Sequence, residues 1–590
     1  MPTIYPLIMG REAMIATQHY LSASAGARLF AHRGNAIDAA VAATFVEGVV
    51  NPHMHTIGGE APMLIYSAVA RRVIAINGNM MAPARATIAH YQSLDLKLIP
   101  GHGLLAAGVP AAFGALTTAL ATFGTKSLAE VLQPALEFAE QGFPMHVGLA
   151  GEELDADAPQ QIAGAGASIR HNAERFLKQW PSSAKVYMPD GKVPAPGTLI
   201  RNPALANFYR RMLDAEASAK NQGRGAAIGA ARDRFYRGDI AREIAAWSEL
   251  HGGLLAESDL AAFITKIEEP VHVDYRGVTV NKCGPWSQGP AFLQQLRLLE
   301  GYDLAAMGHN SPGYIHHVVE ASKLAFADRE AYYGDPDFTE VPINALLSQQ
   351  YAGVRRALID ERRASAEQRP GDPIAMRALR NGAAAGTRPW GAGTIHVTAA
   401  DRDGNMIAVT ASGGWIPSSP VVESLGFPLG TRMQTFYLDE RHPNALRPGK
   451  RPRTTLSPSL ATLGGEPYLA FGTPGGDQQD QWTLQFFFNV IDFGMNLQEA
   501  IEAPKFSTPH APSTFYPHNA RPGVLRVEGR IDEGVRAALA GRGHQIETRP
   551  PWSEGHVLAV EIDRARGILL GGADPRGQAQ PVMPARAIGW

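Results

Sequence analysis

The feature that most constrains this chain is an alternating segment at residues 394–412 that turns back on itself. The segment reads TIHVTAADRDGNMIAVTAS, and apolar side chains alternate with polar or small ones on both sides of 402–405, Arg-Asp-Gly-Asn. An Asp-Gly pair between two such runs is a strong signal for a β-hairpin, because both residues tolerate the backbone angles of a tight turn. The sequence therefore predicts strands over 394–401 and 406–412.

A run of small residues, Gly391, Ala392 and Gly393, stands directly before Thr394 and the hairpin. The simpler interpretation is a turn that leads into the first strand. The alternative is a peptide bond that the protein cuts. A threonine at a free N-terminus has a hydroxyl that attacks and an α-amine, with a reference pKa near 7.7–8.0, that serves as its base. Glycine at 393 lets the backbone bend for an attack by Thr394 on the preceding carbonyl.

The rest of the 590-residue chain mixes helical and strand patterns and is long enough for one large layered domain or for several ordinary ones. Helices are predicted within 19–53, 125–270, 311–338 and 477–494, and strands within 61–78, 274–284, 467–476 and 556–576. This order favours a layered architecture with an antiparallel sheet core. The segment 361–393 is rich in Arg, Ala, Gly and Pro without apolar periodicity, which predicts an exposed or mobile linker and a boundary.

Composition excludes several kinds of partner and site. With 54 basic and 56 acidic residues, the formal net charge of -2 gives no reason to expect nucleic acid or an anionic membrane as a partner. The single cysteine, Cys283, excludes an internal disulfide and any site that needs several cysteines. No stretch reaches the roughly 20 apolar residues that span a bilayer, and the pattern of a secretory signal is not found at the N-terminus. We expect a soluble, cytoplasmic protein that acts on small molecules.

Two short motifs have a simple structural interpretation. The basic run RPGKRPR at 447–453 is compatible with a phosphate-binding patch, but in a nearly neutral protein a solvated loop is the better interpretation. His53 and His55 would point the same way on a strand, as a metal pair requires, yet no third ligand stands nearby. A structural role, or a place in the wall of an active site, is favoured for both histidines.

The motif GTPGGDQ at 472–478 lies between a predicted strand and a predicted helix. It lacks the Lys-Ser/Thr pair of a nucleotide-binding loop. Two successive glycines at the start of a helix nevertheless expose backbone N–H groups that would stabilise a developing anion. A plain turn is the alternative. No Gly-x-Ser-x-Gly motif occurs, and 19 histidines allow no Ser-His-Asp set to be chosen from the sequence.

The hairpin segment also carries a family resemblance. GTIHVTAADRDGNMIAVT resembles the subunit-junction motif of γ-glutamyltransferases, in which a threonine lies two residues before a histidine and a D-x-D-G-N turn follows. Further motifs of that family occur in order along the chain. They are GNAIDAAVAA (34–43), HTIGGEAPMLIY (55–66), NMMAPARAT (79–87), AAGVPAAFGAL (106–116), DLAAFITKIEEPVHVDYRG (259–277), EASKLAFADREAYYGDPDF (320–338), KRPRTTLSPS (450–459), FGTPGGDQ (471–478) and GGADPR (571–576).

The resemblance implies an α+β fold, the four-layer αββα sandwich of the N-terminal nucleophile hydrolases, with self-cleavage between Gly393 and Thr394. The products would be a large chain, 1–393, and a small chain, 394–590, which stay packed together as one catalytic unit. The segment 361–393 would swing away. We expect no metal and no cofactor, and we expect a small-molecule substrate as the partner of the paired chains.

Individual positions take their expected roles from the same resemblance. Thr394 falls on the nucleophile, and Ser412 on the second hydroxyl residue that hydrogen-bonds it, with serine in place of the usual threonine. The pair Gly475-Gly476 matches the glycines of the oxyanion hole. The pair Thr454-Thr455 matches two serines that contact the substrate carboxylate. The resemblance therefore implies intact machinery for acyl transfer.

The residues that hold a γ-glutamyl group in that family are altered in this chain. Asn79 stands where an arginine holds the α-carboxylate, and Gly414 replaces an asparagine. Arg432 and Thr435 stand where glutamine and aspartate hold the α-amino group. The exchange reverses the polarity that an L-glutamyl zwitterion needs, and an unpaired charge in a desolvated pocket costs on the order of several kcal/mol. We expect poor γ-glutamyl activity.

Our preferred hypothesis is a self-cleaving threonine hydrolase that acts on an amide or related acyl bond of an acidic, non-glutamyl substrate. Arg432 offers a planar fork for a carboxylate or keto acid, and a surface arginine paired elsewhere is the alternative. The short connection 437–449 predicts a more open pocket. Three other hypotheses are a genuine γ-glutamyltransferase or glutathione hydrolase with a rebuilt clamp, a C–C bond-cleaving biosynthetic relative, and a non-enzymatic relative.

Overall fold

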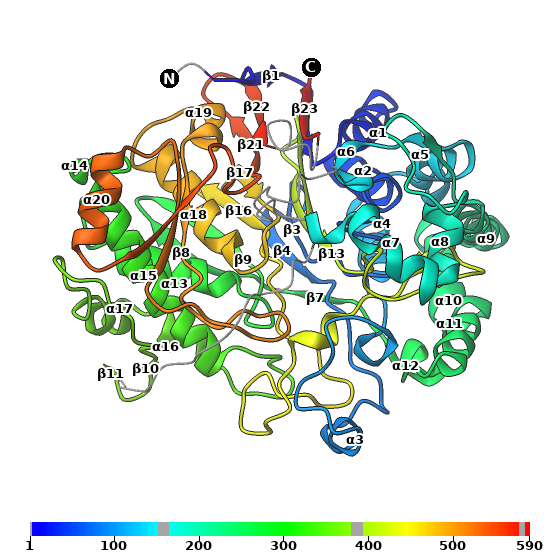
Figure 1. The fold of residues 1–590 in the computed structure, drawn as a ribbon. Coiled ribbons are helices and arrows are strands. Elements are labelled where there is room, and N and C mark those ends of the chain that lie inside the picture. Colours follow the sequence, from blue (N-terminus) through cyan, green and yellow to red (C-terminus); the bar gives the residue numbers. More distant parts are fainter. Residues whose placement is uncertain (1–2, 152–164, 379–392, 577–583) are drawn as a thin grey trace.

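Two seven-stranded β-sheets lie face to face at the centre of the molecule, and helices cover the outer face of each (Figure 1). The structure is a computed structural model that describes residues 3–151, 165–378, 393–576 and 584–590. Three buried apolar clusters correspond to the interfaces between these layers. This is the α+β, four-layer αββα sandwich that the sequence predicted.

The strands of both sheets pair in antiparallel fashion. The first sheet has the order β1 (Ile8–Gly10), β22 (Ile568–Ala573), β21 (Leu558–Asp563), β17 (Glu466–Gly472), β16 (Ser459–Leu463), β9 (Val278–Lys282) and β8 (Val271–Tyr275). The second has the order β23 (Arg586–Gly589), β2 (Ala13–Thr17), β12 (Thr394–Asp401), β13 (Met406–Ser412), β3 (Met63–Ser67), β4 (Arg72–Asn77) and β7 (Lys266–Glu268). The predicted hairpin over 394–412 is confirmed, because β12 begins at Thr394 and β13 ends at Ser412.

Alternation along the strands separates the two faces of the second sheet. Ile15 and Val397 belong to the cluster beneath the helices, whereas Met14 and Ala400 belong to the cluster between the sheets. Successive side chains of a strand point to opposite faces, so one strand contributes to both clusters. Leu460 of the first sheet completes the inter-sheet cluster from the other side.

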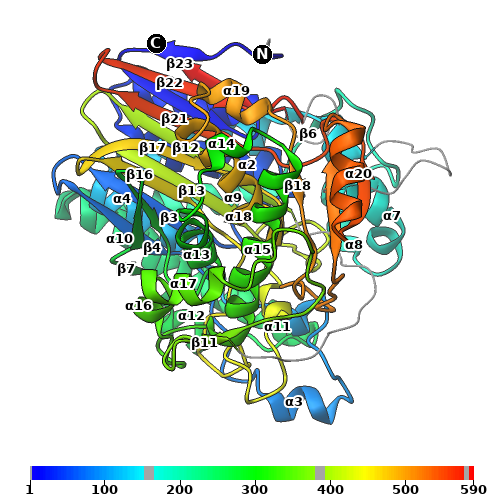
Figure 2. The same cartoon turned by 90° about the vertical axis from the view of Figure 1, so that its left-hand side faces the viewer.

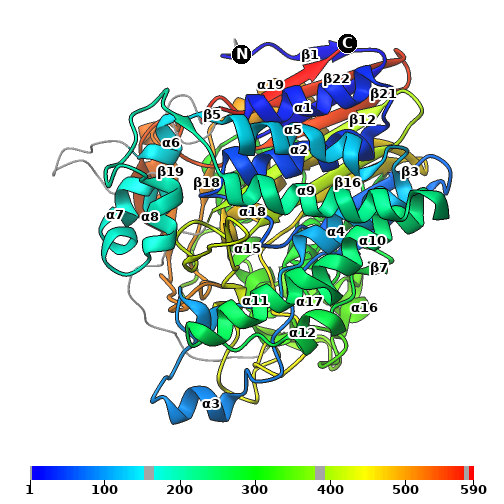
Figure 3. The ribbon, with the colours of Figure 1, turned by 90° about the vertical axis from the view of Figure 1, so that its right-hand side faces the viewer.

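Helices form the two outer layers. The first sheet is covered by α13 (Gly289–Leu299), α15 (Pro312–Tyr332), α18 (Gln479–Ile491) and α19 (Leu497–Glu502), which face the viewer in Figure 2. The second sheet is covered by α1 (Tyr20–Ala31), α2 (Ala36–Val50), α4 (Ala112–Phe123), α5 (Leu128–Gln141), α9 (Pro203–Ser218) and α10 (Arg224–Arg237), seen in Figure 3. Among the described residues, no helix has both the length and the apolar character needed to cross a membrane.

The predicted pair of helices near the N-terminus is confirmed. α1 and α2 are separated by Gly34 and Asn35, and Asn35 caps α2 by accepting from the backbone N–H of Ile37 and Asp38. Every residue of α2 is buried. A helix that is apolar all round belongs in a protein interior, and α2 packs directly beneath the sheet that carries Thr394.

The parts of the chain before and after residue 393 share both sheets. In the second sheet β12 pairs with β2, and β13 pairs with β3. In the first sheet β16 pairs with β9, and β22 pairs with β1. A division into 1–393 and 394–590 therefore runs through both sheets, so the two parts would have to break β-ladders in order to separate.

The first part of the predicted linker, 361–378, is exposed at many positions, among them 361–363 and 374–375, but it is also tied to the body of the protein. This part packs against the body of the protein, where Arg369 Nη2 lies 2.9 Å from the buried carboxylate of Glu320. Its polar composition serves specific partners that belong to other segments, which a local pattern does not reveal. The rest of the segment, 379–392, lies outside the described residues, and it includes Gly391 and Ala392, which precede Gly393.

The basic run 447–453 is exposed at Arg447 and Pro448, but the prediction of a solvated loop is wrong for 450–453. Lys450, Arg451 and Arg453 are all buried. Arg451 Nη1 donates to the carbonyl oxygen of Asn79 at 2.7 Å. Buried cations need hydrogen-bond acceptors, and the run uses them to tie its loop to neighbouring segments.

Candidate active site

The hairpin β12–β13 sets the position of Thr394. β12 begins at Thr394, and the register of the hairpin places Thr394 opposite Ser412, the last residue of β13. The Thr394 hydroxyl donates to Ser412 Oγ at 3.2 Å. Both residues are buried, with 2% and 0% exposure. Because directly opposite side chains of an antiparallel pair share one face, the turn of the hairpin is enough to bring these hydroxyls together.

The carbonyl oxygen of Gly393 lies against the same hydroxyl. It accepts hydrogen bonds from Ser412 Oγ at 2.6 Å and from Trp415 Nε1 at 2.5 Å. Ser412 Oγ also accepts a hydrogen bond from Arg432 Nη2 at 2.9 Å. A hydroxyl has one proton and two lone pairs. The Ser412 proton therefore points at Gly393, while its lone pairs face Arg432 and Thr394.

The glycine turn Gly475-Gly476 joins β17 to α18, as predicted. Both glycines have positive φ, 132° and 60°. A side chain at Gly475 would meet the ring of Trp482 at 2.1 Å, so conformation and space both require glycine there. Phe515 links this turn to the rest of the site, since its ring is 3.2 Å from an ideal Cβ on Gly476 and 5.2 Å from the Arg432 guanidinium.

Arg432 is fully buried and paired with the equally buried carboxylate of Glu60, so it is not a surface arginine. Its Nε donates to Glu60 Oε1, and its guanidinium lies 5.1 Å from the ring of Trp415 and 5.2 Å from that of Phe515. Burial raises the pKa of the Glu60 carboxyl, and the charge of Arg432 opposes that rise. Arg432 Nη1 is buried and has no hydrogen-bond partner among the described residues.

Glu60 connects the other predicted residues. Its backbone exchanges hydrogen bonds with Ser412 in both directions, at 2.8 and 2.9 Å. The hydroxyl of Thr454 hydrogen-bonds its carboxylate and opposes the rise in its pKa. The backbone N–H of Met80 donates to Glu60 Oε2 at 3.4 Å. Glu60 thus joins the Thr394–Ser412 side of the site to the side where substrate recognition is expected.

Three further predicted residues are buried beside this pair and contribute no charge. Asn79 Nδ2 donates to the carbonyl oxygen of Pro452 at 2.5 Å, and its Oδ1 has no partner among the described residues. Thr435 Oγ1 donates to the carbonyl oxygen of Arg432 at 2.9 Å. Thr455 Oγ1 has no hydrogen-bond partner in the described part of the chain. Asn79 and Thr455 therefore each have one buried oxygen without a hydrogen-bond partner in the described part of the chain.

Two consecutive glycines explain how Trp415 reaches the carbonyl of Gly393. Gly413 and Gly414 have φ of 78° and 60°, and they turn the chain back at the end of β13. An ideal Cβ on Gly414 would lie 2.3 Å from Thr56 Oγ1, which itself donates to the carbonyl oxygen of Gly414 at 2.7 Å. The asparagine expected from the family resemblance does not fit here while Thr56 holds this place.

The histidines near the site are neutral because they are buried. His55 Nδ1 lies 3.3 Å from the carbonyl oxygen of Ser412, and burial lowers the pKa of His55 to about 4. Burial likewise lowers the pKa of His396, on β12, to about 3. His53 lies in a turn, so the side-by-side pair that a strand would give does not form. His55 and His396 are poor bases at neutral pH, and the structural role predicted for the His53/His55 motif is supported.

One group in the described part of the chain has its potential ligand atoms close enough to hold a metal ion, and it consists of His316, Glu320 and His544. It does not involve the hairpin. His316 Nδ1 lies 2.9 Å from His544 Nε2, and Glu320 is paired with both Lys323 and Arg369. Because two cations already balance the carboxylate, we interpret this group as an internal hydrogen-bond and ion-pair network.

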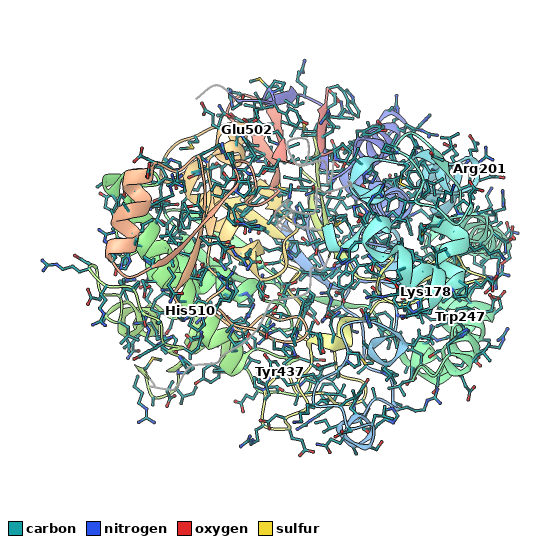
Figure 4. All side chains as sticks on the ribbon, viewed as in Figure 1. Lys178, Arg201, Trp247, Tyr437, Glu502 and His510 are labelled. Carbon is teal, nitrogen blue, oxygen red and sulfur yellow. The ribbon has the colours of Figure 1, made fainter. Side chains whose placement is uncertain are left out.

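The loop that carries Phe515 is anchored from two sides. Thr514 donates to the Asp477 carboxylate through its backbone N–H at 3.0 Å and its hydroxyl at 2.6 Å. Tyr437, labelled in Figure 4, stacks on His518 with 4.3 Å between the ring centroids. These contacts fix an aromatic wall beside the glycine turn.

Three residues of the site were not predicted from the sequence, and they are Glu60, Trp415 and Phe515. A signal existed for Trp415, because two glycines after a strand indicate a sharp turn that returns the next side chain to the strand end. Glu60 lies in one of the recognised motifs, but its partner Arg432 is 372 residues further along the chain. No local pattern marks Phe515.

A family model described as gamma-glutamyltranspeptidase matches residues 22–583 of the chain. The chain belongs to the γ-glutamyltranspeptidase family. A relative within it, the glutathione hydrolase-like YwrD proenzyme of Bacillus subtilis (strain 168), is 32% identical over 581 residues, which cover 98% of this chain and 99% of that protein. The motif-based resemblance is thus confirmed.

Solved structures of γ-glutamyltranspeptidase relatives agree with the fold. LmbA2991HD is 43% identical, with a TM-score of 0.91 and 100% of both chains covered. A cephalosporin acylase from Bacillus halodurans is 27% identical, with a TM-score of 0.83 over 100% of this chain and 98% of that one. The protein is a hydrolase or acyltransferase of this family and has the N-terminal nucleophile hydrolase fold.

Proposed function

We propose that this chain is a proenzyme that cuts its own Gly393–Thr394 bond and then uses Thr394 to cleave an amide, or a related acyl bond, of an acidic, non-glutamyl substrate. The observation that carries the proposal is the contact set at the bond itself. Hydrogen bonds of 3.2 and 2.6 Å link the Thr394 hydroxyl to Ser412 and Ser412 to the Gly393 carbonyl oxygen. The Bacillus subtilis relative is named as a proenzyme, which supports the same maturation here.

The matured protein consists of two chains, 1–393 and 394–590, that act as one unit. Because both chains contribute strands to both sheets, the cut leaves the sheets intact. The cut frees the α-amine of Thr394 next to its own hydroxyl and next to Ser412.

In the matured enzyme the Thr394 hydroxyl attacks the acyl carbon of the substrate. Its α-amine takes the proton, because an amine with a reference pKa near 7.7–8.0 is a competent base near neutral pH. Backbone N–H groups of the turn Gly475-Gly476 stabilise the negative charge on the acyl oxygen. Water then hydrolyses the acyl-enzyme, which releases the acid and restores Thr394.

The recognition side of the site favours an acidic acyl donor. Arg432 Nη1 is an unpartnered guanidinium N–H among the described residues, and a carboxylate or keto-acid oxygen is a strong acceptor for it. Thr455 Oγ1 is a second buried group without a hydrogen-bond partner among the described residues. The usual anchors of a γ-glutamyl group are missing, since Thr435 carries no charge and Asn79 Nδ2 is engaged by the Pro452 carbonyl.

One observation favours a second candidate, a genuine γ-glutamyltransferase or glutathione hydrolase. Glu60 supplies an anion next to the cation of Arg432, and together they have the charges that would bind the two α-substituents of a glutamyl zwitterion. Such binding has to separate a buried ion pair, which costs about 3–5 kcal/mol when one charge is left uncompensated. For that reason we prefer the acidic, non-glutamyl donor.

A donor panel on the purified, matured enzyme tests the proposal. We expect turnover of oxamoyl, glutaryl or keto-acid donors, with Thr394→Ala protein as the blank and a neutral acetyl amide as the matched control. The keto-acid donors also report C–C bond cleavage. Strong γ-glutamyl turnover would favour the second candidate. Arg432→Ala should reduce the turnover of acidic donors more than that of the neutral acetyl amide. Rates are divided by the concentration of chains that begin with Thr394. An equal loss of turnover on all donors would contradict the role of Arg432.

A further inference from the structure

Trp415 makes a contact that the attack of mature Thr394 on a substrate does not require. Its indole Nε1 donates to the Gly393 carbonyl oxygen at 2.5 Å, beside the 2.6 Å bond from Ser412 Oγ. Trp415 is 1% exposed, so this hydrogen bond is shielded from water. The Gly393 oxygen is the atom on which negative charge develops when Thr394 attacks this carbonyl.

We propose that Trp415 is a catalytic residue of self-cleavage, whose indole N–H stabilises the oxyanion formed on Gly393. The inference rests on the proposed cut at Gly393–Thr394 and assigns the chain a second oxyanion site. Among the hydrogen bonds of the described residues, none runs from the backbone N–H groups of Gly475-Gly476 to the Gly393 oxygen. The glycine turn therefore serves the acyl oxygen of the substrate, and Ser412 with Trp415 serves the carbonyl of the precursor.

The step balances with water as the only co-reactant. Thr394 Oγ forms a bond to the carbonyl carbon of Gly393, and the π electrons move to the carbonyl oxygen, where Ser412 and Trp415 hold the charge. Collapse of this intermediate breaks the C–N bond, and the hydroxyl proton of Thr394 ends on its nitrogen. Water cleaves the resulting ester into the Gly393 carboxylate and the free Thr394 hydroxyl.

The surroundings of Trp415 suit it to this role. Gly413 and Gly414 both have positive φ, and they turn the chain so that the Trp415 indole returns to the end of β13. The Arg432 guanidinium lies 5.1 Å from the Trp415 ring and donates to Ser412 Oγ at 2.9 Å, so one cation stands behind both donors. In a dry site, fixed donors stabilise charge far better than the same groups do in water.

The variant Trp415→Phe tests the inference, because it removes the N–H and keeps an aromatic ring. We expect the conversion of the 63.2 kDa chain into 1–393 and 394–590, followed by intact mass, to slow about 10²–10³-fold, the effect of deleting one oxyanion donor. Trp286→Phe is the matched control, since it also deletes a buried indole donor, to Glu268 at 2.7 Å. The control should cleave at the wild-type rate.

The outcomes separate this inference from the proposed function. Slowed cleavage in a Trp415→Phe chain with the wild-type melting temperature supports it. If that variant fails to fold, the cleavage rate is measured with benzothienylalanine at position 415, because this residue keeps the shape of the indole and lacks the N–H. Cleavage of a folded variant at the wild-type rate would overturn the role of Trp415 alone. A wild-type chain that stays whole would overturn the proposed cut and this inference together.

Discussion

The two halves of the site are built in different ways. The reacting half is the end of the hairpin β12–β13, where Gly393, Thr394 and Ser412 meet through strand register and short hydrogen bonds. The recognition half centres on the buried pair of Arg432 and Glu60. Strand geometry fixes the first half, whereas a pair of opposite charges from distant segments fixes the second.

This difference predicts how the halves respond to change. A hydroxyl replaces another hydroxyl at low cost, which is why serine at 412 still donates to the Gly393 oxygen. A buried cation, in contrast, requires a buried anion, so neither member of the pair changes freely by itself. Loss of the Thr394 hydroxyl in the reacting half should stop every reaction, and changes in the recognition half should alter stability and donor choice.

The largest effect is expected from Thr394→Ala, which removes the proposed nucleophile. The chain should stay whole on a gel, and turnover should fall by up to about 10⁶-fold, as it does when a hydrolase loses its nucleophile. Thr394→Ser keeps a hydroxyl and should still be cut. A Thr394→Ala chain cleaved after Gly393 would mean that another group attacks.

Breaking the recognition half should cost stability first. Arg432→Ala leaves Glu60 buried without its cation, which should destabilise the fold by about 3–5 kcal/mol. Burial already raises the pKa of Glu60 above 4.5, and the loss of Arg432 removes an opposing influence. A folded state with a raised carboxyl pKa binds more protons than the unfolded state, so stability falls as pH rises above 4.5. Urea unfolding should therefore show a smaller deficit at acidic pH.

A double variant provides the control for this prediction. Glu60→Leu combined with Arg432→Met removes both charges and fills their volume, and it should recover most of the lost stability while losing the preference for acidic donors. If the double variant is as unstable as Arg432→Ala, the unpaired charge of Glu60 is not the cause.

The pH dependence of the activity of the matured enzyme distinguishes the Thr394 amine from the nearby histidines as the catalytic base. Activity should rise with pH as the Thr394 amine loses its proton, near its reference pKa of about 7.7–8.0. Burial lowers the pKa of His55 to about 4 and that of His396 to about 3, so both are neutral throughout this range. Their Asn variants should leave the midpoint of the profile in place. If activity also changes with a midpoint near pH 6.5, and this transition is lost in one of the variants, the histidine replaced in that variant is the base.

The smallest effect is expected from Thr455→Val. Its hydroxyl has no hydrogen-bond partner among the described residues, so its removal should leave the melting temperature unchanged. The KM for acidic donors should rise about fivefold, the value of one hydrogen bond of about 1 kcal/mol. Thr454→Val is the comparison, because its hydroxyl supports Glu60 and its loss should lower stability. An unchanged KM in Thr455→Val would remove Thr455 from the binding site.

The parts of the molecule that depend on neighbouring residues could be predicted from the sequence. The hairpin is the clearest case, because the Asp-Gly turn fixes both strands and their register, and the register alone places Thr394 opposite Ser412. The glycine turn before α18 is a second case, since glycines with positive φ followed by a helix leave a local pattern.

The parts that depend on distant segments could not be predicted in this way. Arg432 was recognised as a cation, but its environment is decided by Glu60, whose sequence position carries no sign of the pairing. The prediction of a solvated loop failed for 450–453, because the acceptors that bury these charges come from other segments. The ion pair of Arg369 with Glu320 could not be predicted for the same reason. A local sequence pattern shows that a charged side chain requires a partner when it is buried, but it does not show which distant residue is that partner.

The most direct test of the assignment of Thr394 is intact mass spectrometry with N-terminal sequencing of the purified protein, fresh and after incubation. We predict that the 63.2 kDa chain is replaced by two chains, 1–393 and 394–590, and that the smaller one begins with Thr394. A chain that stays whole, or a cut at any other bond, would contradict the self-cleavage from which the catalytic role of Thr394 follows.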